Sequence, residues 1–449
     1  MKKLQVWLFR IMILCLPLNL GAFYTHLMEE DLIFAFDVVL FALYILWFVE
    51  RKELRKGQLV WGKITLPFIL LLFWTGLSAL NAISLTMWGM GIYMAIKAYM
   101  IYLYIINKIT TKEDLAWFIK WLAAGVAFQG FLGIVQYTTG SSLGLEFLGA
   151  QAKQRMAGVT RVRGTIGYPN QFGAWLALQI PIAVSLFIFE LGSRKKLFYG
   201  GSAVLGIFGL LLSFSRSAWA GLLGSGLMFL LILARKRLLK ARYVLTIGLA
   251  MAFVGVLVVI FWDTIMLRFE TGDTGKYRLI MMEIAYDLIK ENPLLGVGLS
   301  NYKFHQVELF RYWNPVHNEY LRLAAETGLP GLLFFMVIVI ICLKESYKML
   351  QARDRFIFSV ALGSLCSMWA FLFLVNFGPE YSHYRVQFLF WIVLGVITAL
   401  RRIYRHTLNA NAARQQTKLS RKPIETVSPQ NRVPPSYPHP EESGRGVRP

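Results

Sequence analysis

The sequence predicts an all-α, polytopic integral membrane protein. Hydrophobic residues make up 56% of the 449 residues and charged residues only 16%, which is far from the composition of a soluble domain. Apolar runs of roughly 20 residues, long enough to cross a hydrocarbon core of about 30 Å, recur along most of the chain. We count about twelve such runs.

The first predicted span follows Met1-Lys2-Lys3. It lacks a small-residue cleavage site and leads directly into a second apolar run, so we interpret it as a retained helix and not as a signal peptide. In chain order, the predicted spans are 4–24, 31–49, 64–83, 88–106, 115–137, 170–190, 197–214, 217–234, 243–262, 329–343, 355–376 and 386–400.

Lysine and arginine accumulate in alternate connections between the spans, which predicts that these connections are cytoplasmic. Both termini then lie in the cytoplasm. The formal net charge of +22 is explained by these loops and a basic tail, and without a nucleic-acid motif it indicates no nucleic-acid partner. The basic connections are 51–63, 108–112, 194–196, 235–242 and 344–355.

Composition divides the chain into two parts. Residues 1–400 hold all the spans, whereas residues 401–449 are polar, basic and rich in proline. The second part has nothing with which to build a core, so we expect a disordered cytoplasmic tail. Its cations can contact anionic membrane lipids, although a solvated tail without a dedicated partner is the simpler interpretation.

Two long connections, 138–169 and 263–328, fall on the predicted outer side. The first carries Lys153, Arg155, Arg161 and Arg163, on the side where the positive-inside rule disfavours cations. The second is the large extracytoplasmic loop, and it is partly helical because its apolar residues recur at helical spacing before Pro293.

Two further arginines lie at positions that are energetically unfavourable for a cation. Arg278 lies in the first turn of the loop helix, where the helix dipole disfavours a cation; either Glu283 or Asp287 pairs with it, or an anionic ligand does. Arg216 lies between two apolar runs with almost no loop. It either snorkels to the interface or faces a partner or pathway.

A histidine follows a proline turn in the same loop. Asn314 and Pro315 mark a helix start and place His317 in the first turn, where the dipole opposes protonation. His317 is then either a hydrogen-bonded structural residue or a neutral base for an attacking hydroxyl. Guanidinium groups match phosphate oxygens, so arginines on this face suit a pyrophosphate on a lipid carrier.

Four segments resemble the O-antigen ligase and polymerase superfamily. NPLLGVGLSNYKF provides a G-x-G segment, VHNEYLRLAAETGLPGLLFF an H-N-x-x-L helix ending in E-x-G-x-x-G, SFSRSAW an S-x-S-R turn, and RGTIGYPNQFG an R-G-x-x-x-x-P-N segment. The resemblance extends over about residues 155–335 and also fits the span number and the large outer loop.

The resemblance implies a glycosyltransferase of the bacterial cytoplasmic membrane with its site on the outer side. It would transfer a glycan from undecaprenyl pyrophosphate to an acceptor, with no metal ion, cofactor or nucleotide sugar. The matching arginines, Arg216 and Arg278, would hold the pyrophosphate, and His317 would activate the acceptor. Arg163, Asn170 and Asn318 match substrate-side positions, the asparagines through hydrogen bonds.

The acceptor stays open at this stage. A ligase would use lipid A core or a protein hydroxyl, and a polymerase would use the next lipid-linked repeat unit. Outer-loop aromatics can stack on sugars or anchor the chain at the interface. They are Tyr302, Phe304, Phe310, Tyr312 and Trp313.

Two other classes of protein are alternatives to the glycosyltransferase. An anion or solute transporter would bury ionisable groups near the membrane midplane, whereas here Lys97 is the main charge away from the span ends. A metal-dependent enzyme would need paired acids, and the outer residues Glu270 and Asp273 form no convincing pair.

Overall fold

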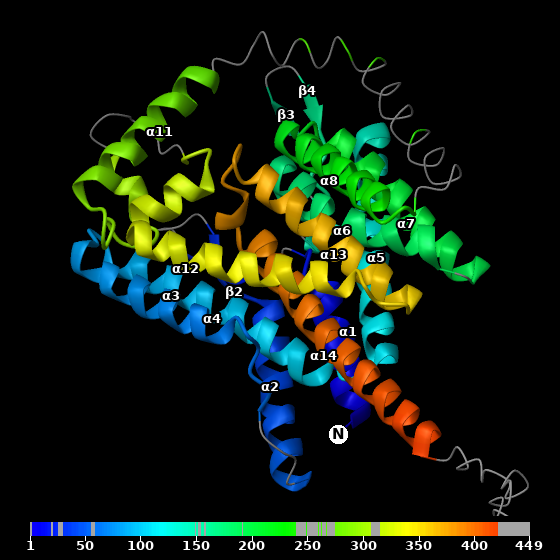
Figure 1. Ribbon diagram of the computed structural model, residues 1–449. Helices are drawn as coiled ribbons and strands as arrows, with labels where there is room; N and C mark the ends of the chain where they lie inside the picture. The colour runs from blue at the N-terminus through cyan, green and yellow to red at the C-terminus, as the bar shows by residue number, and fades with distance from the viewer. Residues whose placement is uncertain are drawn as a thin grey trace, which may run out of the picture. The chain divides into compact units, whose positions relative to one another are not determined.

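The computed structural model is nearly all helical, with two short antiparallel hairpins (Figure 1). One compact unit comprises Met1–Tyr404, and Arg405–Pro449 form a second. The structure describes residues 2–18, 21–25, 30–54, 59–148, 150, 154–156, 159–190, 192–238, 248, 259, 262, 266, 274–306 and 315–420.

The structure contains the following α-helices and 3-10 helices, in chain order. The α-helices are α1 (Lys2–Cys15), α2 (Ala35–Leu54), α3 (Thr65–Leu77), α4 (Leu85–Lys108), α5 (Lys112–Thr139), α6 (Pro169–Phe189), α7 (Ser193–Leu212), α8 (Arg216–Arg235), α11 (Thr274–Glu291), α12 (Glu319–Met349), α13 (Arg355–Leu374) and α14 (Tyr384–Ser420). The 3-10 helices are η1 (Ser78–Asn81), η2 (Glu146–Leu148), η3 (Tyr302–His305) and η4 (Glu380–Ser382).

Within the described residues, eight helices are long and apolar enough to cross a membrane, and two shorter apolar helices accompany them. This confirms a polytopic membrane protein. Most of the predicted span 243–262 and most of the loop start at 263–273 lie outside the described residues. The count of twelve spans and the full extent of the outer loop therefore stay predictions.

The N-terminal prediction is wrong in detail. We expected a span over 4–24, but α1 ends at Cys15 and a hairpin of β1 (Gly21–Thr25) and β2 (Glu30–Phe34) follows. Pro17 has no amide hydrogen to continue the helix. The second hairpin, β3 (Gln154–Met156) and β4 (Val159–Arg161), lies in the first long connection.

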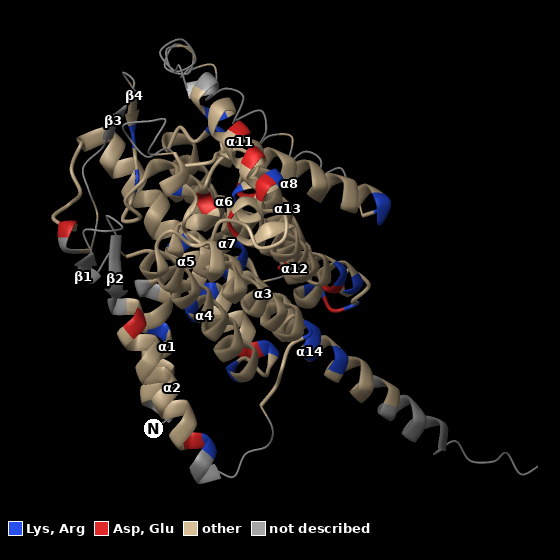
Figure 2. Cartoon of the chain, turned by 90° about the vertical axis from the view of Figure 1, so that its left-hand side faces the viewer, with Lys and Arg blue, Asp and Glu red and all other residues tan. Residues whose placement is uncertain are grey.

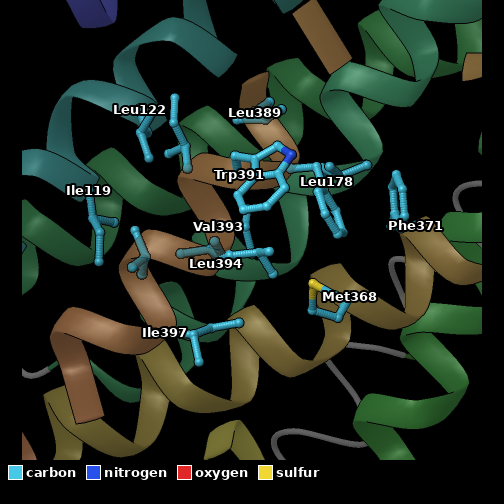
Figure 3. Packing of buried hydrophobic residues seen from close by; sticks show 14 of the residues in the cluster. Ile119, Leu122, Leu178, Met368, Phe371, Leu389, Trp391, Val393, Leu394 and Ile397 are labelled. Carbon is cyan, nitrogen blue, oxygen red and sulfur yellow. The ribbon is translucent and has the colours of Figure 1, made fainter. Parts of the chain in front are cut away.

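The core lies where α5, α6, α13 and α14 meet. Figure 3 shows Trp391 of α14 among Leu178 of α6 and Met368 and Phe371 of α13, each at most 1% exposed. Helix α6 is buried around most of its circumference, as expected of a central helix in a bundle. This core fixes the helix ends that carry the site.

The chain alternates between two ends of the bundle. We call the site end the one where α5, α7 and α13 finish and α6, α8 and α14 begin, and the basic end the opposite one. At the basic end, Glu345 binds Lys63 at 2.7 Å and Arg401 at 2.7 Å. Figure 2 shows Lys and Arg at the free end of α2 and along α14.

Helix α14 continues to Ser420, past the predicted domain boundary at 400. The stretch LNANAARQQTKLS is rich in good helix formers, and Pro423 comes only after it. Disorder is therefore wrong for 401–420. Residues 421–449, the rest of the predicted tail, lie outside the described residues.

Candidate functional site

The turn between α7 and α8 presents Arg216 at the first position of α8. Phe214 has a left-handed φ of 49° and is 2% exposed, and the Ser215 amide donates to Ser213 Oγ at 3.2 Å. A non-glycine residue in this region is strained and persists only where packing fixes it. The turn therefore holds Arg216, which is half-buried, at a defined place.

Helix α11 brings Arg278 to the same end of the bundle. Its buried face includes Met281 and Ala285, and the Tyr302 hydroxyl donates to the Met281 carbonyl at 2.7 Å. This face belongs to a small core whose buried residues are Ala285, Leu288, Val297, Tyr302, Val316 and Ala325. Since Val316 precedes His317, the same core ties Arg278 to His317.

Two glycines allow the G-x-G loop to pack against α12 beside this core. Helix α12 is interrupted at Gly328, where φ is 73°, and a Cβ there would lie 1.9 Å from the Leu294 carbonyl oxygen. The Val297 amide donates to the Ala325 carbonyl at 2.8 Å. A Cβ on Gly296 would meet the backbone of α12 at 2.5 Å. The G-x-G loop can approach α12 this closely only because both positions lack a side chain.

The structure corrects the local setting of His317. Asn318 caps α12, its side chain accepting from the amides of Tyr320 at 3.0 Å and Leu321 at 3.1 Å. His317 therefore precedes the helix and does not lie in its first turn. Its pKa is lowered to about 4 by burial and next by the positive charge of Arg278. The imidazole is neutral at neutral pH, although not because of the helix dipole.

Arg278 interacts electrostatically with both Arg216 and His317. Burial lowers the pKa of Arg278, and the charge of Arg216 lowers it further, partly opposed by Glu380. Arg278 Nε and His317 Nδ1 are buried and have no hydrogen-bond partner among the described residues. Asp287, one expected partner of Arg278, instead pairs with Lys290 at 3.4 Å.

The sequence reasoning missed Glu380, in the loop between α13 and α14. Glu380 is 1% exposed and accepts a hydrogen bond from Ser217 Oγ at 3.3 Å. Burial raises its pKa to about 7, against the opposing influence of His383 and Arg278. Glu319 reinforces the rise. No local pattern in FGPEYSHYR signals this burial, because it arises from packing against α8 and α12.

The segment before α6 has a supporting arrangement. Arg161 is 2% exposed and donates from Nε to the Ser213 carbonyl at 2.7 Å and from Nη2 to Asn170 Oδ1 at 2.5 Å. Asn170 thus braces the α7–α8 turn through Arg161. Arg163 donates to the Gly167 carbonyl at 3.2 Å and is half-buried, and burial lowers its pKa.

Two other predicted substrate residues, Asn318 and Tyr302, make structural contacts. The Asn318 amide is used by the helix cap, and Tyr302 is 2% exposed with its hydroxyl bonded to α11. Phe310, Tyr312 and Trp313 lie outside the described residues. In the described part of the chain, no three His, Cys, Asp or Glu side chains are grouped to hold a metal.

Comparison with protein families matches residues 201–336 to the family described as O-Antigen ligase. The match confirms the resemblance read from the sequence. It contains Arg216, Arg278 and His317, whereas Arg163 and Asn170 lie outside it. No match was found among curated proteins.

Proposed function

We propose that this O-antigen ligase family membrane protein is a glycosyltransferase that moves a glycan from undecaprenyl pyrophosphate to an acceptor hydroxyl. The observation that carries the proposal is that Arg278 lies within electrostatic reach of both Arg216 and His317, although the three residues come from separate segments.

The two arginines favour an anionic ligand. Arg216 and Arg278 repel each other in a half-buried place, and like charges held together in low dielectric are costly unless an anion lies between them. The N-terminus of α8 adds partial positive charge. A pyrophosphate supplies two negative charges and oxygens that accept guanidinium bonds in pairs.

Binding of that anion would prepare His317 for its role. With a pKa of about 4 in the ligand-free protein, the imidazole is neutral but a weak base, whereas a general base works best when its pKa lies near the working pH. Phosphate charge beside Arg278 offsets the cation that depresses the histidine. The donor substrate thus raises the basicity of His317 where the acceptor must be deprotonated.

The reaction follows as a substitution at the anomeric carbon. The acceptor O–H loses its proton to His317, the oxygen forms a bond to the anomeric carbon, and the bond to the pyrophosphate oxygen breaks. Undecaprenyl pyrophosphate leaves with the electron pair. Arg216 and Arg278 stabilise the negative charge that develops on the leaving oxygen, which lowers the barrier.

The charge distribution supports an outer-face site. Lys63, Lys112 and Arg401 lie at the basic end, and the positive-inside rule assigns that end to the cytoplasm. The site end then opens on the extracytoplasmic side.

The test is glycan transfer by the purified full chain in liposomes with a lipid-pyrophosphate-linked donor. His317→Ala should lower the rate by about 10²- to 10⁴-fold, because the base is lost. His406→Ala, at an exposed position of α14, should transfer at the wild-type rate. Wild-type transfer by His317→Ala would remove the base assignment.

The same assay tests the arginines. Arg216→Lys and Arg278→Lys should each slow transfer by about 10²-fold, because a lysine ammonium cannot reproduce a planar two-pronged contact. Arg235→Lys, at the other end of α8, is the matched control. Equal rates in all three variants would place the pyrophosphate elsewhere.

The acceptor is identified by deleting the gene and characterising surface glycans. Full chains accumulating on the carrier would identify a ligase, which we propose. Single repeats with loss of long chains would identify a polymerase instead.

A further inference from the structure

A cavity separate from the site opens at the basic end of the bundle. Its volume is about 1010 Å³. Helices α1, α2, α4, α5 and α14 contribute to its wall, together with the segment that joins α4 to α5. Nothing in the proposed reaction uses this cavity.

Two buried donors face this cavity without a protein partner. Gln5 is 6% exposed; its Oε1 accepts from Lys108 Nζ at 2.9 Å, but its Nε2 has no hydrogen-bond partner among the described residues. Arg10 Nε is also buried and has no hydrogen-bond partner among the described residues. A buried donor left without a hydrogen-bond partner is energetically unfavourable. Since both groups are donors, the missing partner is an acceptor.

The basic side chains of the wall favour an anionic acceptor. Lys108 and Glu50 pair with each other, and Asp114 accepts from the backbone amides of Thr110 and Thr111 at the start of α5. The cavity wall carries four basic side chains, those of Arg10, Arg51, Lys108 and Arg402, and three acidic ones, those of Glu50, Glu113 and Asp114. Arg402 also donates to the Ile109 carbonyl at 2.7 Å. The wall therefore has one more basic side chain than acidic ones.

Aromatic rings give the same cavity an apolar side. Trp47 and Trp117 line it, with Phe9 and Tyr104. The Arg10 guanidinium lies 4.7 Å from the Trp7 ring and 5.3 Å from the Trp117 ring. Tryptophan beside arginine is typical of the level of lipid head groups. The ligand must combine an anion with an apolar body.

We propose that this basic-end cavity binds the head group of an anionic phospholipid, with its phosphate oxygens accepting from Gln5 Nε2 and Arg10 Nε. The bound lipid would join α1 to α4 and α5 from the membrane side. This inference does not depend on the proposed glycosyltransferase reaction.

The experiment measures lipid retention by the delipidated full chain in detergent. Equal amounts of dioleoylphosphatidylglycerol and dioleoylphosphatidylcholine are added, and bound lipid is counted by native mass spectrometry. The wild type should retain phosphatidylglycerol preferentially. Arg10→Gln should reduce that preference about fivefold, and Gln5→Leu should reduce it without changing the charge. Arg235→Gln, a basic-end substitution outside the cavity, should keep the wild-type preference.

Several results would overturn the proposal. One is equal retention of the two lipids by the wild type, and another is the same loss in Arg235→Gln as in Arg10→Gln. Displacement of phosphatidylglycerol by millimolar inorganic phosphate would indicate a site for a free anion. The thermal midpoint in phosphatidylcholine nanodiscs checks folding, and if Arg10→Gln is unfolded, Gln5→Leu decides.

Discussion

Glu380 and His317 have pKa values displaced in opposite directions by the same surroundings. Burial disfavours the charged form of each, so it raises the pKa of the carboxyl and lowers that of the imidazole. Arg278 lowers the pKa of both. At neutral pH the histidine is therefore neutral, whereas the carboxyl is close to its midpoint.

This difference predicts a pH dependence of substrate binding. Above about pH 7, ionised Glu380 competes with a pyrophosphate for Arg278, so KM for the donor should rise, by up to about tenfold per pH unit. Glu380→Gln should remove the rise. The charged or titratable groups that act on Glu380 are His383, Glu319 and Arg278; a wild-type pH profile in Glu380→Gln would show that Glu380 is not the group responsible.

The same variant has a signature in stability. The native pKa of Glu380 is raised, so its protonated form stabilises the fold fully below the unfolded value of 4.5, and this contribution is lost as pH rises through about 7. Thermal unfolding of the wild type should therefore lose stability across that window relative to Glu380→Gln.

For single residues, the sequence predicts the arginines of the site better than the carboxyl group that lies near them. Arg216 and Arg278 are conspicuous because a membrane surface and a helix start are costly places for them. Glu380 follows a proline turn of the kind expected at a membrane interface. Its burial arises only from packing in the folded structure. A Cβ on Gly378 would lie 2.2 Å from Glu380 Oε1, so a side chain at position 378 would displace the Glu380 carboxyl.

Among the elements, the α7–α8 turn depends on the hairpin before α6. Arg161 reaches from β4 to the Ser213 carbonyl, and the Val162 amide donates to the Leu212 carbonyl at 3.2 Å. Both bonds end on the turn that starts α8 at Arg216. Arg161 is thus a positioning residue for Arg216 in our proposal.

Arg161→Lys should expose that dependence. One ammonium cannot hold Ser213 and Asn170 in the geometry of a guanidinium, and a buried bond from a charged group is worth about 1.5–3 kcal/mol. We expect kcat for transfer to fall about tenfold or more, with a smaller change in KM. Arg194→Lys, exposed in the first turn of α7, is the control. A lower thermal midpoint with unchanged kcat would limit Arg161 to a structural role.

Sequence periodicity predicts the long helices and fails at their ends. The apolar runs locate α4 to α8 and α12 to α14, because burial and membrane insertion both follow apolar composition. The two hairpins are short and depend on pairing between segments. The position of His317 depends on which residue caps α12, and Asn318 does so although Asn314 and Pro315 also form a start signal.

Across the whole molecule, a buried charge remote from the site has a structural explanation. Lys97, the residue that kept a transporter in consideration, is 4% exposed and binds Asp37 at 2.8 Å, joining α4 to α2. A paired buried charge is a costly contact to break. This pair therefore favours a fixed bundle over an ion pathway at that point.

The orientation of the bundle is the prediction on which the outer-face site depends. In a background where the three cysteines are replaced, Ser141→Cys reports on the site end, just past α5, and Ser193→Cys on the basic end, at the start of α7; both serines are exposed. A membrane-impermeant maleimide added to cells with a permeable outer membrane should label the first and reach the second only after lysis, since the positive-inside rule keeps the basic end in the cytoplasm. The reverse pattern would put Arg216, Arg278 and His317 on the cytoplasmic side, where a glycan displayed on the outer leaflet could not reach them. Glycan transfer in the cysteine-replaced background shows that the labelled protein retains its native fold.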